Sequence, residues 1–412
     1  MRVHRLAALA LLCLTQRTLA ALPPVPVPAE NPITEPKRVL GKMLFWDEQL
    51  STNGTVACGT CHQPAFGGAD PRAGRNPGTD KGTIDDVRGS PGIVFLDRAG
   101  KPQPHPVYGS DPQVTPRLAP SNFGALWAEQ VFWDGRAGPT VTDPVSGEIA
   151  IRHGGALENQ VLSALVNSGE MAKTGRTWTD LINDVTNARP LAFATALPAD
   201  VAAAITAAPT YAKLFANAFG DSSVTPVRVA FAIATYERTL VADQTAWDRY
   251  DAGDADALPG RAVAGWRAMQ AFHCTACHTP PLFTSNRFFQ IGLRKVDFDR
   301  GRESVTHDPK DAGRMKVPSL RNAALQARFM HTGEFTNLGS AIRFYQNSIP
   351  LPERSDIPGF GIYAFNVSQV DEADIREFLT RALVDPRVRD EVFPFDRPQL
   401  RSEQEPRALQ SQ

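Results

Sequence analysis

The sequence predicts a mostly helical protein of two modules, with long irregular loops and little sheet. One five-residue pattern, Cys-x-x-Cys-His, occurs twice, at residues 58–62 and 274–278, with roughly 200 residues between the copies. A segment of helical apolar periodicity precedes each copy. The chain has 412 residues, of which 42% are hydrophobic and 21% are charged. This length and composition are typical of a globular protein with two ordinary domains.

Residues 1–20 have the features of an export signal. A basic start is followed by a short apolar core at residues 6–14 and by a small-residue cleavage site that ends at Ala20. The apolar core is too short to span a bilayer, and no later segment of the sequence is apolar for long enough. The net charge of −1 gives no reason to expect nucleic acid or a membrane surface as a partner. We expect cleavage near Ala20 and a soluble periplasmic protein.

The first module is expected over residues 21–222. A proline-rich arm ends where Thr34 and Pro36 open a helix, as a capping residue followed by proline in the first turn. The first Cys-x-x-Cys-His copy follows a short loop later. Residues 67–116 are rich in glycine, proline and aspartate and show no clear periodicity, so we expect a long functional loop region there.

The second module is expected over residues 223–384 and repeats this plan loosely. A helix is predicted to start at Thr225-Pro226, another after Pro259-Gly260, and a last amphipathic helix over residues 371–383. Residues 41–45 and 265–269 echo one another, which suggests a duplication. The tail, residues 385–412, is expected to be irregular, and its last dozen residues to be disordered.

The repeated pattern is the attachment signature of c-type haem. Cys58 and Cys61 would bind the two vinyl groups of one porphyrin, and Cys274 and Cys277 those of another. The adjoining histidines, His62 and His278, would be the proximal iron ligands. A zinc site would need four ligands at suitable spacing, and a thioredoxin-like pair does not require the histidine. The fifth cysteine, Cys13, lies in the leader, so the sequence favours two cytochrome c-like haem domains.

Several further segments resemble those of one family, the bacterial dihaem cytochrome c peroxidases and their relatives of the MauG type. The resemblance covers most of the mature chain and includes its characteristic Phe-Trp-Asp-Gly-Arg-Ala segment. The segments that carry it are residues 40–45 (Leu-Gly-Lys-Met-Leu-Phe), 132–137 (Phe-Trp-Asp-Gly-Arg-Ala), 167–171 (Asn-Ser-Gly-Glu-Met), 316–322 (Lys-Val-Pro-Ser-Leu-Arg-Asn) and 330–333 (Met-His-Thr-Gly).

The resemblance implies a role for each candidate site residue. The first haem would be the peroxide site, with His62 proximal and the distal side accessible. Glu170 would be its acid/base residue, and Gln160 would line the same pocket. The second haem, with His278 proximal, would store and transfer electrons, and Trp133 would lie between the haems as a relay. Without the family motif, Glu170 reads as an ordinary exposed glutamate and Trp133 as a core aromatic.

The distal ligand of the second haem separates the branches of the family. Its peroxidases have methionine there, which raises the haem potential, and MauG-type proteins have tyrosine. Tyr345 falls at this position, on a helix expected after residues 331–333 with Phe335, Leu338 and Ile342 on the same face. Met315 and Met330 are the alternatives, but they lie in other family segments. We expect Tyr345 to be the ligand and to lower the potential.

The chain also departs from the family pattern. Members with a switchable peroxide site often carry a distal histidine about sixteen residues after the first haem histidine. That spacing reaches Gly78 here, so an open, high-spin first haem is expected. Calcium between the domains is common in the family. Leu118 stands where an asparagine is usual, and Gln326 and Arg328 replace the residues of its carbonyl ligands, which argues against calcium although backbone carbonyls could still bind it.

The sequence therefore predicts a periplasmic dihaem peroxidase. Its partners would be hydrogen peroxide and a small electron-donor protein, a cytochrome c or a cupredoxin, and family members are often homodimers. Two alternatives remain. A MauG-type enzyme would oxidise tryptophan or tyrosine side chains of a partner protein by sharing oxidising equivalents across both haems. A dihaem electron carrier without turnover would need both irons fully ligated.

Overall fold

A computed structural model describes residues 22–78, 85–346 and 367–404 of the chain. The leader predicted over residues 1–20 lies outside these ranges. The protein is mostly helical, as predicted. The helices are α1 (Glu35–Trp46), α2 (Cys58–Cys61), α3 (Ala156–Leu165), α4 (Trp178–Asn187), α5 (Ala199–Ala207), α6 (Tyr211–Phe219), α7 (Pro226–Glu237), α8 (Ala246–Asp251), α9 (Gly260–Ala271), α10 (Glu303–Thr306), α11 (Leu338–Phe344), α12 (Gln369–Arg381), α13 (Pro386–Arg389) and α14 (Arg401–Gln404).

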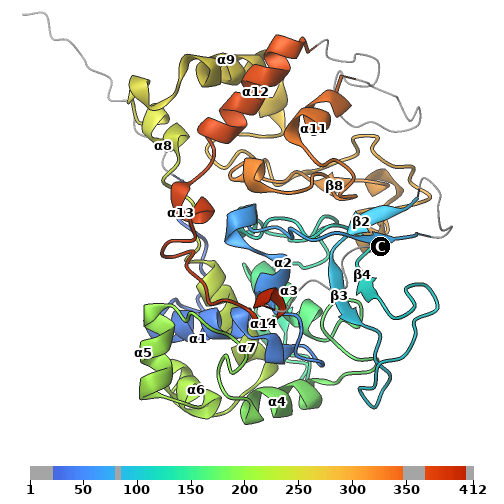
Figure 1. Cartoon of the computed structure of the whole chain (residues 1–412), viewed down its shortest axis with the longest axis vertical. Helices are drawn as coiled ribbons and strands as arrows, with labels where there is room; N and C mark the ends of the chain where they lie inside the picture. The colour runs from blue at the N-terminus through green and yellow to red at the C-terminus, as the bar shows by residue number, and fades with distance from the viewer. Residues whose placement is uncertain (1–21, 79–84, 347–366, 405–412) are drawn as a thin grey trace, which may run out of the picture.

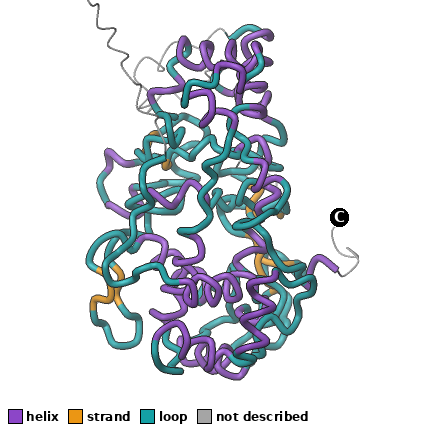
Figure 2. The backbone as a smooth tube through the Cα atoms, turned by 90° about the vertical axis from the view of Figure 1, so that its left-hand side faces the viewer, coloured by secondary structure: helices purple, strands orange, loops and turns teal. Residues whose placement is uncertain are grey.

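The predicted scarcity of sheet is confirmed, because the strands form only two-stranded antiparallel pairs in the described ranges. The pairs are β1 (Gly74–Asn76) with β2 (Val87–Gly89), β3 (Pro91–Val94) with β4 (Pro112–Val114), β5 (Val141–Thr142) with β6 (Ile149–Ile151), and β7 (Phe288–Phe289) with β8 (Met315–Lys316). The first two pairs lie within residues 67–116, so this predicted loop region contains two short hairpins. Helices gather toward the two ends of the molecule, and loops and strands fill much of the space between (Figure 1, Figure 2).

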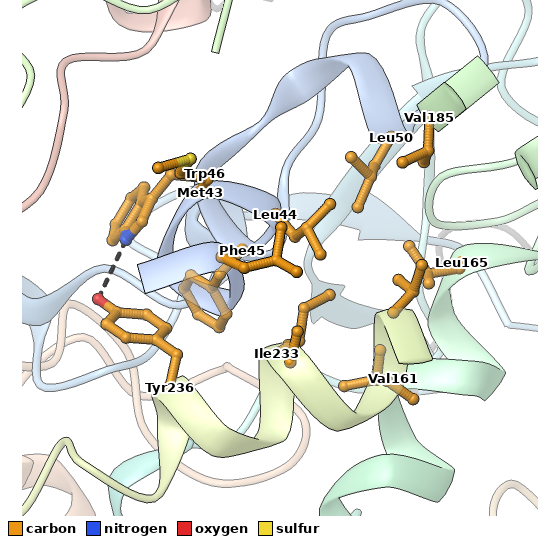
Figure 3. Packing of buried hydrophobic residues seen from close by; sticks show 14 of the residues in the cluster. Met43, Leu44, Phe45, Trp46, Leu50, Val161, Leu165, Val185, Ile233 and Tyr236 are labelled. Atoms are coloured by element: carbon orange, nitrogen blue, oxygen red, sulfur yellow. Dashed lines mark hydrogen bonds between the residues drawn. The ribbon is translucent and has the colours of Figure 1, made fainter. Parts of the chain in front are cut away.

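The larger core forms where α1 packs against α7. Leu44 and Phe45 of α1 face Ile233 and Tyr236 of α7, and the Trp46 indole nitrogen donates to the Tyr236 hydroxyl at 3.2 Å (Figure 3). The start of α7 is as predicted, because the Thr225 side chain caps its first turn. Thr34 makes no such side-chain bond at the start of α1. Although α7 lies in the range expected for the second module, its buried side chains belong to the first core.

The smaller core forms where α9 packs against α12. Trp247, Trp266, Phe283 and Phe378 meet there, with ring centroids between 4.7 and 6.1 Å apart. Such aromatic clusters bury large apolar areas and pack with defined ring geometry. Within the described ranges, no helix has both the length and the apolar character needed to cross a membrane.

Both cores are built on the same close helix crossing. A Cβ atom added at Gly41 of α1 would lie 1.9 Å from the backbone oxygen of Ala232 in α7. A Cβ atom added at Gly265 of α9 would lie 1.9 Å from the backbone oxygen of Asp374 in α12. The nearest side chain is that of Tyr236 in the first case and that of Phe378 in the second. The echo between residues 41–45 and 265–269 therefore corresponds to a repeated structural unit.

Replacing Gly41 by alanine should lower the free energy of unfolding by about 2–3 kcal/mol, because the two helices must move apart. Gly265→Ala should have a similar effect in the second core. Gly260→Ala is the matched control, since an added Cβ atom at the start of α9 meets nothing within 4 Å. Denaturant unfolding of the three variants compares them. A Gly41→Ala protein as stable as the Gly260→Ala protein would contradict the close crossing.

The segment after residue 384, for which the sequence predicts an irregular tail, packs back against the first module. In Figure 1 this red segment, with α13 and α14, runs from the α9/α12 end toward α1. Phe395 and Leu400 are buried in the larger core. The Asp396 carboxylate lies 2.8 Å from the buried ammonium of Lys42. Four of the residues expected to be disordered form α14 instead, and residues 405–412 lie outside the described ranges.

Candidate active site

The first Cys-x-x-Cys-His motif forms one helical turn. Cys58 and Cys61 begin and end α2, and the backbone nitrogen of His62 donates to the Cys58 carbonyl at 3.1 Å. Nδ1 of His62 lies 3.0 Å from the carbonyl oxygen of Gly68. Gly67 and Gly68 have positive φ angles of 66° and 76°. A carbonyl oxygen can only accept, so Nδ1 carries the proton and Nε2 is left for a metal.

The second motif has the same arrangement. Residues Cys274–Ala276 form a 3-10 turn, and the backbone nitrogen of His278 donates to the Cys274 carbonyl at 2.9 Å. Nδ1 of His278 lies 3.2 Å from the carbonyl oxygen of Phe283. Burial lowers the pKa of both histidines, which favours the neutral imidazole that binds iron. In both motifs a backbone carbonyl thus orients the histidine.

The residues present fit two c-type haems. The four cysteines of the motifs are free thiols, so none is used in a disulfide. Two buried polar side chains of the second module, those of Lys316 and His331, are also available to a bound group. Burial lowers the pKa of Lys316 to about 8, and its ammonium lies 3.4 Å from an amide oxygen, that of Asn286. Nε2 of His331 is buried and has no partner among the described residues. Haem propionates are carboxylates that would satisfy such groups.

Glu170 lies within electrostatic range of the first motif. Burial is the main reason that the pKa of the Cys58 and Cys61 thiols is raised, and the Glu170 carboxylate adds to the rise at both. Burial raises the pKa of Glu170 itself to about 7, against a smaller opposing effect of Arg136. Oε1 of Glu170 accepts from the Asn167 amide at 2.9 Å. The side chain can therefore bind and release a proton near neutral pH.

The two hairpins of the loop region hold the Glu170 segment in place. Ile93 of β3 donates its backbone N–H to the Glu170 carbonyl at 3.0 Å. The Gln113 amide of β4 donates to the Ser168 carbonyl at 2.8 Å. At Gly92 an added Cβ atom would lie 2.2 Å from the Gly169 carbonyl oxygen, so only glycine allows this approach. The loop region is thus a support for the candidate acid/base residue.

Gln160 lies half-buried in α3, the helix that leads into the Glu170 segment. Its neighbour Glu158 is fully buried and pairs with Arg238 of the loop after α7 at 2.6 Å. This ion pair holds α3 against α7 and so helps to fix the position of Gln160 in α3. The placement leaves the pocket role of Gln160 a prediction.

Trp133 lies where the two modules meet. Its indole nitrogen donates to the Leu118 carbonyl at 2.7 Å, and its own carbonyl accepts from the backbone nitrogen of Lys316 in β8 at 2.7 Å. Its ring centroid is 5.9 Å from that of His331. Trp133 therefore contacts residues of the first and the second module, and its role as a relay between two haems stays a prediction.

The residues around Trp133 tie the modules together. Arg117 binds Asp134 at 2.6 Å on one side and Asp299 of the second module at 2.6 Å on the other. At Gly135, which has a φ of 77°, an added Cβ atom would lie 2.6 Å from the Phe288 ring. Arg117 and Asp299 could not be predicted from the sequence, because a salt bridge between residues 182 apart leaves no local pattern.

Tyr345 lies at the end of α11, near the second motif. Burial raises the pKa of its hydroxyl, and the thiols of Cys274 and Cys277 add to the rise, so these three side chains are within electrostatic range of one another. The helix is shorter than expected, since it begins at Leu338 and leaves Phe335 outside. The alternative, Met315, is buried in β8, and Met330 lies in a turn with a φ of 66°. The assignment of Tyr345 as the ligand remains a prediction.

Glu237, the last residue of α7, is a buried titratable residue that is not among the candidates predicted from the sequence. Its side chain is buried, and burial raises its pKa to about 7. A signal was present, because Glu237 lies four residues after Ile233 and so shares the apolar face of the helix. A carboxylate on such a face is costly unless it has a function or a partner.

The chain is similar to a known family and to several known proteins. The family described as di-haem cytochrome c peroxidase matches residues 35–256. The methylamine utilization protein MauG of Methylophilus methylotrophus is 26% identical over 358 residues, covering 86% of this chain and 84% of that protein. The cytochrome c551 peroxidase of Pseudomonas aeruginosa is 28% identical over 327 residues, covering 77% and 74%. A solved MauG-like protein associated with microbial copper homeostasis has a similar fold, with a TM-score of 0.62, 24% identity and coverage of 91% and 96%.

Proposed function

Because this chain belongs to the di-haem cytochrome c peroxidase family, we propose that it reduces hydrogen peroxide to water at the first motif. The chain is an oxidoreductase of a family that holds two c-type haems, and its relatives include both peroxidases and MauG proteins. The observation that carries the proposal is the Glu170 carboxyl, with a pKa of about 7, within electrostatic range of Cys58 and Cys61. A non-catalytic electron carrier has no use for such a group.

The overall reaction consumes one peroxide, two electrons and two protons and yields two waters. When bound, the haem held by Cys58, Cys61 and His62 would supply the iron that binds peroxide and passes it electrons. Glu170 accepts a proton from one peroxide oxygen and returns it to the other oxygen, which leaves as water. A pKa near the working pH suits both halves of this transfer. Asn167 keeps the carboxylate oriented through its bond to Oε1.

Electrons would reach the first site from the second through Trp133. The Trp133 indole N–H donates to a backbone carbonyl, which cannot accept a proton. Oxidised Trp133 would thus keep its proton and be re-reduced by an electron alone. We propose a small redox protein, a cytochrome c or a cupredoxin, as the donor, together with export to the periplasm and removal of a signal peptide near Ala20. A homodimer, as in family members, fits the same proposal.

Tyr345 favours a second candidate function. A phenolate on the second haem would lower its ferric/ferrous potential and favour higher oxidation states. The protein would then oxidise tryptophan or tyrosine side chains of a partner protein, in the manner of MauG. The position of Tyr345 near Cys274 and Cys277 supports this alternative.

Replacing Tyr345 by methionine should raise the midpoint potential of the second haem, because a thioether favours the ferrous state more than a phenolate does. A redox titration followed by absorption spectroscopy measures the shift. Tyr108→Phe is the control, since Tyr108 hydrogen-bonds within the first module, to the Val114 carbonyl. If the Tyr345→Met protein kept the wild-type potential, Tyr345 would not be the ligand.

Steady-state peroxide reduction by the fully haemylated protein, with reduced cytochrome c as donor, tests the proposed function. Fast turnover of the donor is the expected result. Consumption of peroxide that oxidises the protein but barely turns over the donor would replace it with the second candidate.

A further inference from the structure

The loop behind the first haem histidine is held by two consecutive residues. The Ser121 hydroxyl donates to the Gly67 carbonyl at 2.6 Å. The backbone N–H of the next residue, Asn122, donates to the Gly68 carbonyl at 3.2 Å. This is the carbonyl that also accepts from Nδ1 of His62. Asn122 therefore shares with the proximal histidine the group that orients it.

The second module repeats this arrangement. The Ser319 hydroxyl donates to the Leu282 carbonyl at 2.6 Å. The backbone N–H of the next residue, Leu320, donates to the Phe283 carbonyl at 3.2 Å. That carbonyl accepts from Nδ1 of His278. Asn122 and Leu320 thus occupy equivalent places behind the two proximal histidines.

The helix crossings give a second pair of equivalent positions. Gly41 approaches α7 beside Tyr236, and Gly265 approaches α12 beside Phe378. The residues that follow, Glu237 and Leu379, are therefore equivalent, and both are buried. The first module places an asparagine and a glutamate where the second places two leucines.

Asn122 and Glu237 contact one another in the first core. The Asn122 amide nitrogen lies 3.5 Å from Oε1 of Glu237. The two side chains belong to residues that are 7% and 3% exposed. The other Glu237 oxygen, Oε2, and the Asn122 oxygen have no hydrogen-bond partner among the described residues. Oε2 is thus a buried carboxylate oxygen with a free lone pair that can bind a proton.

The charged groups around Glu237 largely cancel. Arg238 lowers its pKa and Glu158 raises it, and these two residues form a buried ion pair with each other. On α1, which packs against α7, Arg38 and Lys42 are bound to Asp200. Among the described residues no cation forms an ion pair with Glu237, and burial raises its pKa to about 7. The carboxylate in turn raises the pKa of the Cys58 thiol, which places it close to the first haem attachment.

We propose that Asn122 and Glu237 form a proton-binding pair behind the first haem that the second haem lacks. When the first site gains one electron, Oε2 of Glu237 binds one proton from solvent, so the net charge of the buried site stays constant. Asn122 transmits the state of this pair to the Gly68 carbonyl and so to His62. Glu237 is a positioning residue and does not touch peroxide. The proposal rests on the assignment of haem to both motifs, as in the proposed function.

Redox titrations of the fully haemylated protein with dithionite and mediators, from pH 5.5 to 8.5, test the pair without reference to turnover. In the wild-type protein the midpoint potential of the first haem should fall as the pH rises through about 7. Glu237→Gln keeps the size of the side chain and its bond to Asn122 but removes the proton site, so this dependence should weaken and keep only the part due to Glu170, whose pKa is also about 7. Glu237→Leu, which copies the second module, should behave likewise. Leu379→Met is the matched control in the second core and should leave the dependence intact.

Redox-difference infrared spectra give a direct readout. A carboxylic acid band should appear on reduction of the wild-type protein and be missing from the Glu237→Gln protein. A Glu237→Gln protein that keeps the wild-type pH dependence and the band would overturn the proposal. The same pH dependence at the second haem, removed together with that of the first haem by Glu237→Gln, would overturn it as well, because the pair would not distinguish the sites. Failure of peroxide turnover with an intact pH dependence would instead count against the proposed function alone.

Discussion

Replacing Glu170 by glutamine should lower the rate of peroxide reduction by about 10²–10⁴-fold, because the amide cannot carry the proton between the two oxygens. The fold should be kept, since glutamine can still accept the bond from Asn167. Steady-state kinetics with reduced cytochrome c measure the loss. Glu129→Gln, at an exposed position, is the matched control and should retain wild-type turnover.

The pH profile separates this role from a structural one. Burial raises the pKa of Glu170 to about 7, so the carboxylate that accepts the first proton builds up as the pH rises through that value. In the wild-type protein kcat/KM for peroxide should therefore increase with pH up to about 7 and then level off. The Glu170→Gln protein should lack this inflection. An unchanged inflection in the variant would show that another group accepts the proton.

Replacing Trp133 by phenylalanine should slow electron transfer between the haems by at least about tenfold, equivalent to about 1.4 kcal/mol of activation free energy. Phenylalanine keeps the ring but is much harder to oxidise, and it loses the hydrogen bond to the Leu118 carbonyl. Stopped-flow mixing of the reduced protein with peroxide measures the rate at which the second haem is reoxidised.

Trp127→Phe is the control for this experiment. The Trp127 indole also donates to a backbone carbonyl, that of Pro23, at 2.9 Å, but it does not contact the second module through that bond. The control should reoxidise at the wild-type rate. Equal rates in the Trp133→Phe and wild-type proteins would show that electrons bypass Trp133.

The parts of the site that could be predicted from the sequence are those with local patterns. The two Cys-x-x-Cys-His copies specify their own turns, and Thr225-Pro226 and Pro259-Gly260 mark the starts of α7 and α9 correctly. The helical periodicity of the apolar residues predicts a mostly helical fold with little sheet, and the structure confirms it.

The parts that could not be predicted depend on contacts between distant residues. The return of residues 385–404 to the first core depends on a buried ammonium at Lys42 that needs Asp396, 354 positions away. The packing of α7 in the first core depends on Gly41 of α1, because only a residue without a side chain lets the Ala232 carbonyl of α7 come so close to α1. Glu237 lies on the apolar face of its helix, but the sequence does not show that Asn122, 115 positions away, lies against it. Periodicity indicates which face of a helix is buried, but not against which partner.

Electron paramagnetic resonance of the fully oxidised, haemylated protein tests the central claim most directly, namely that the two haem sites are built alike but work differently. We expect one high-spin ferric signal, from the accessible first haem held by His62, and one low-spin signal, from the second haem held by His278 and Tyr345. Two low-spin signals would mean that both irons are fully ligated. That result would contradict a peroxide site beside Glu170 and leave an electron carrier as the function.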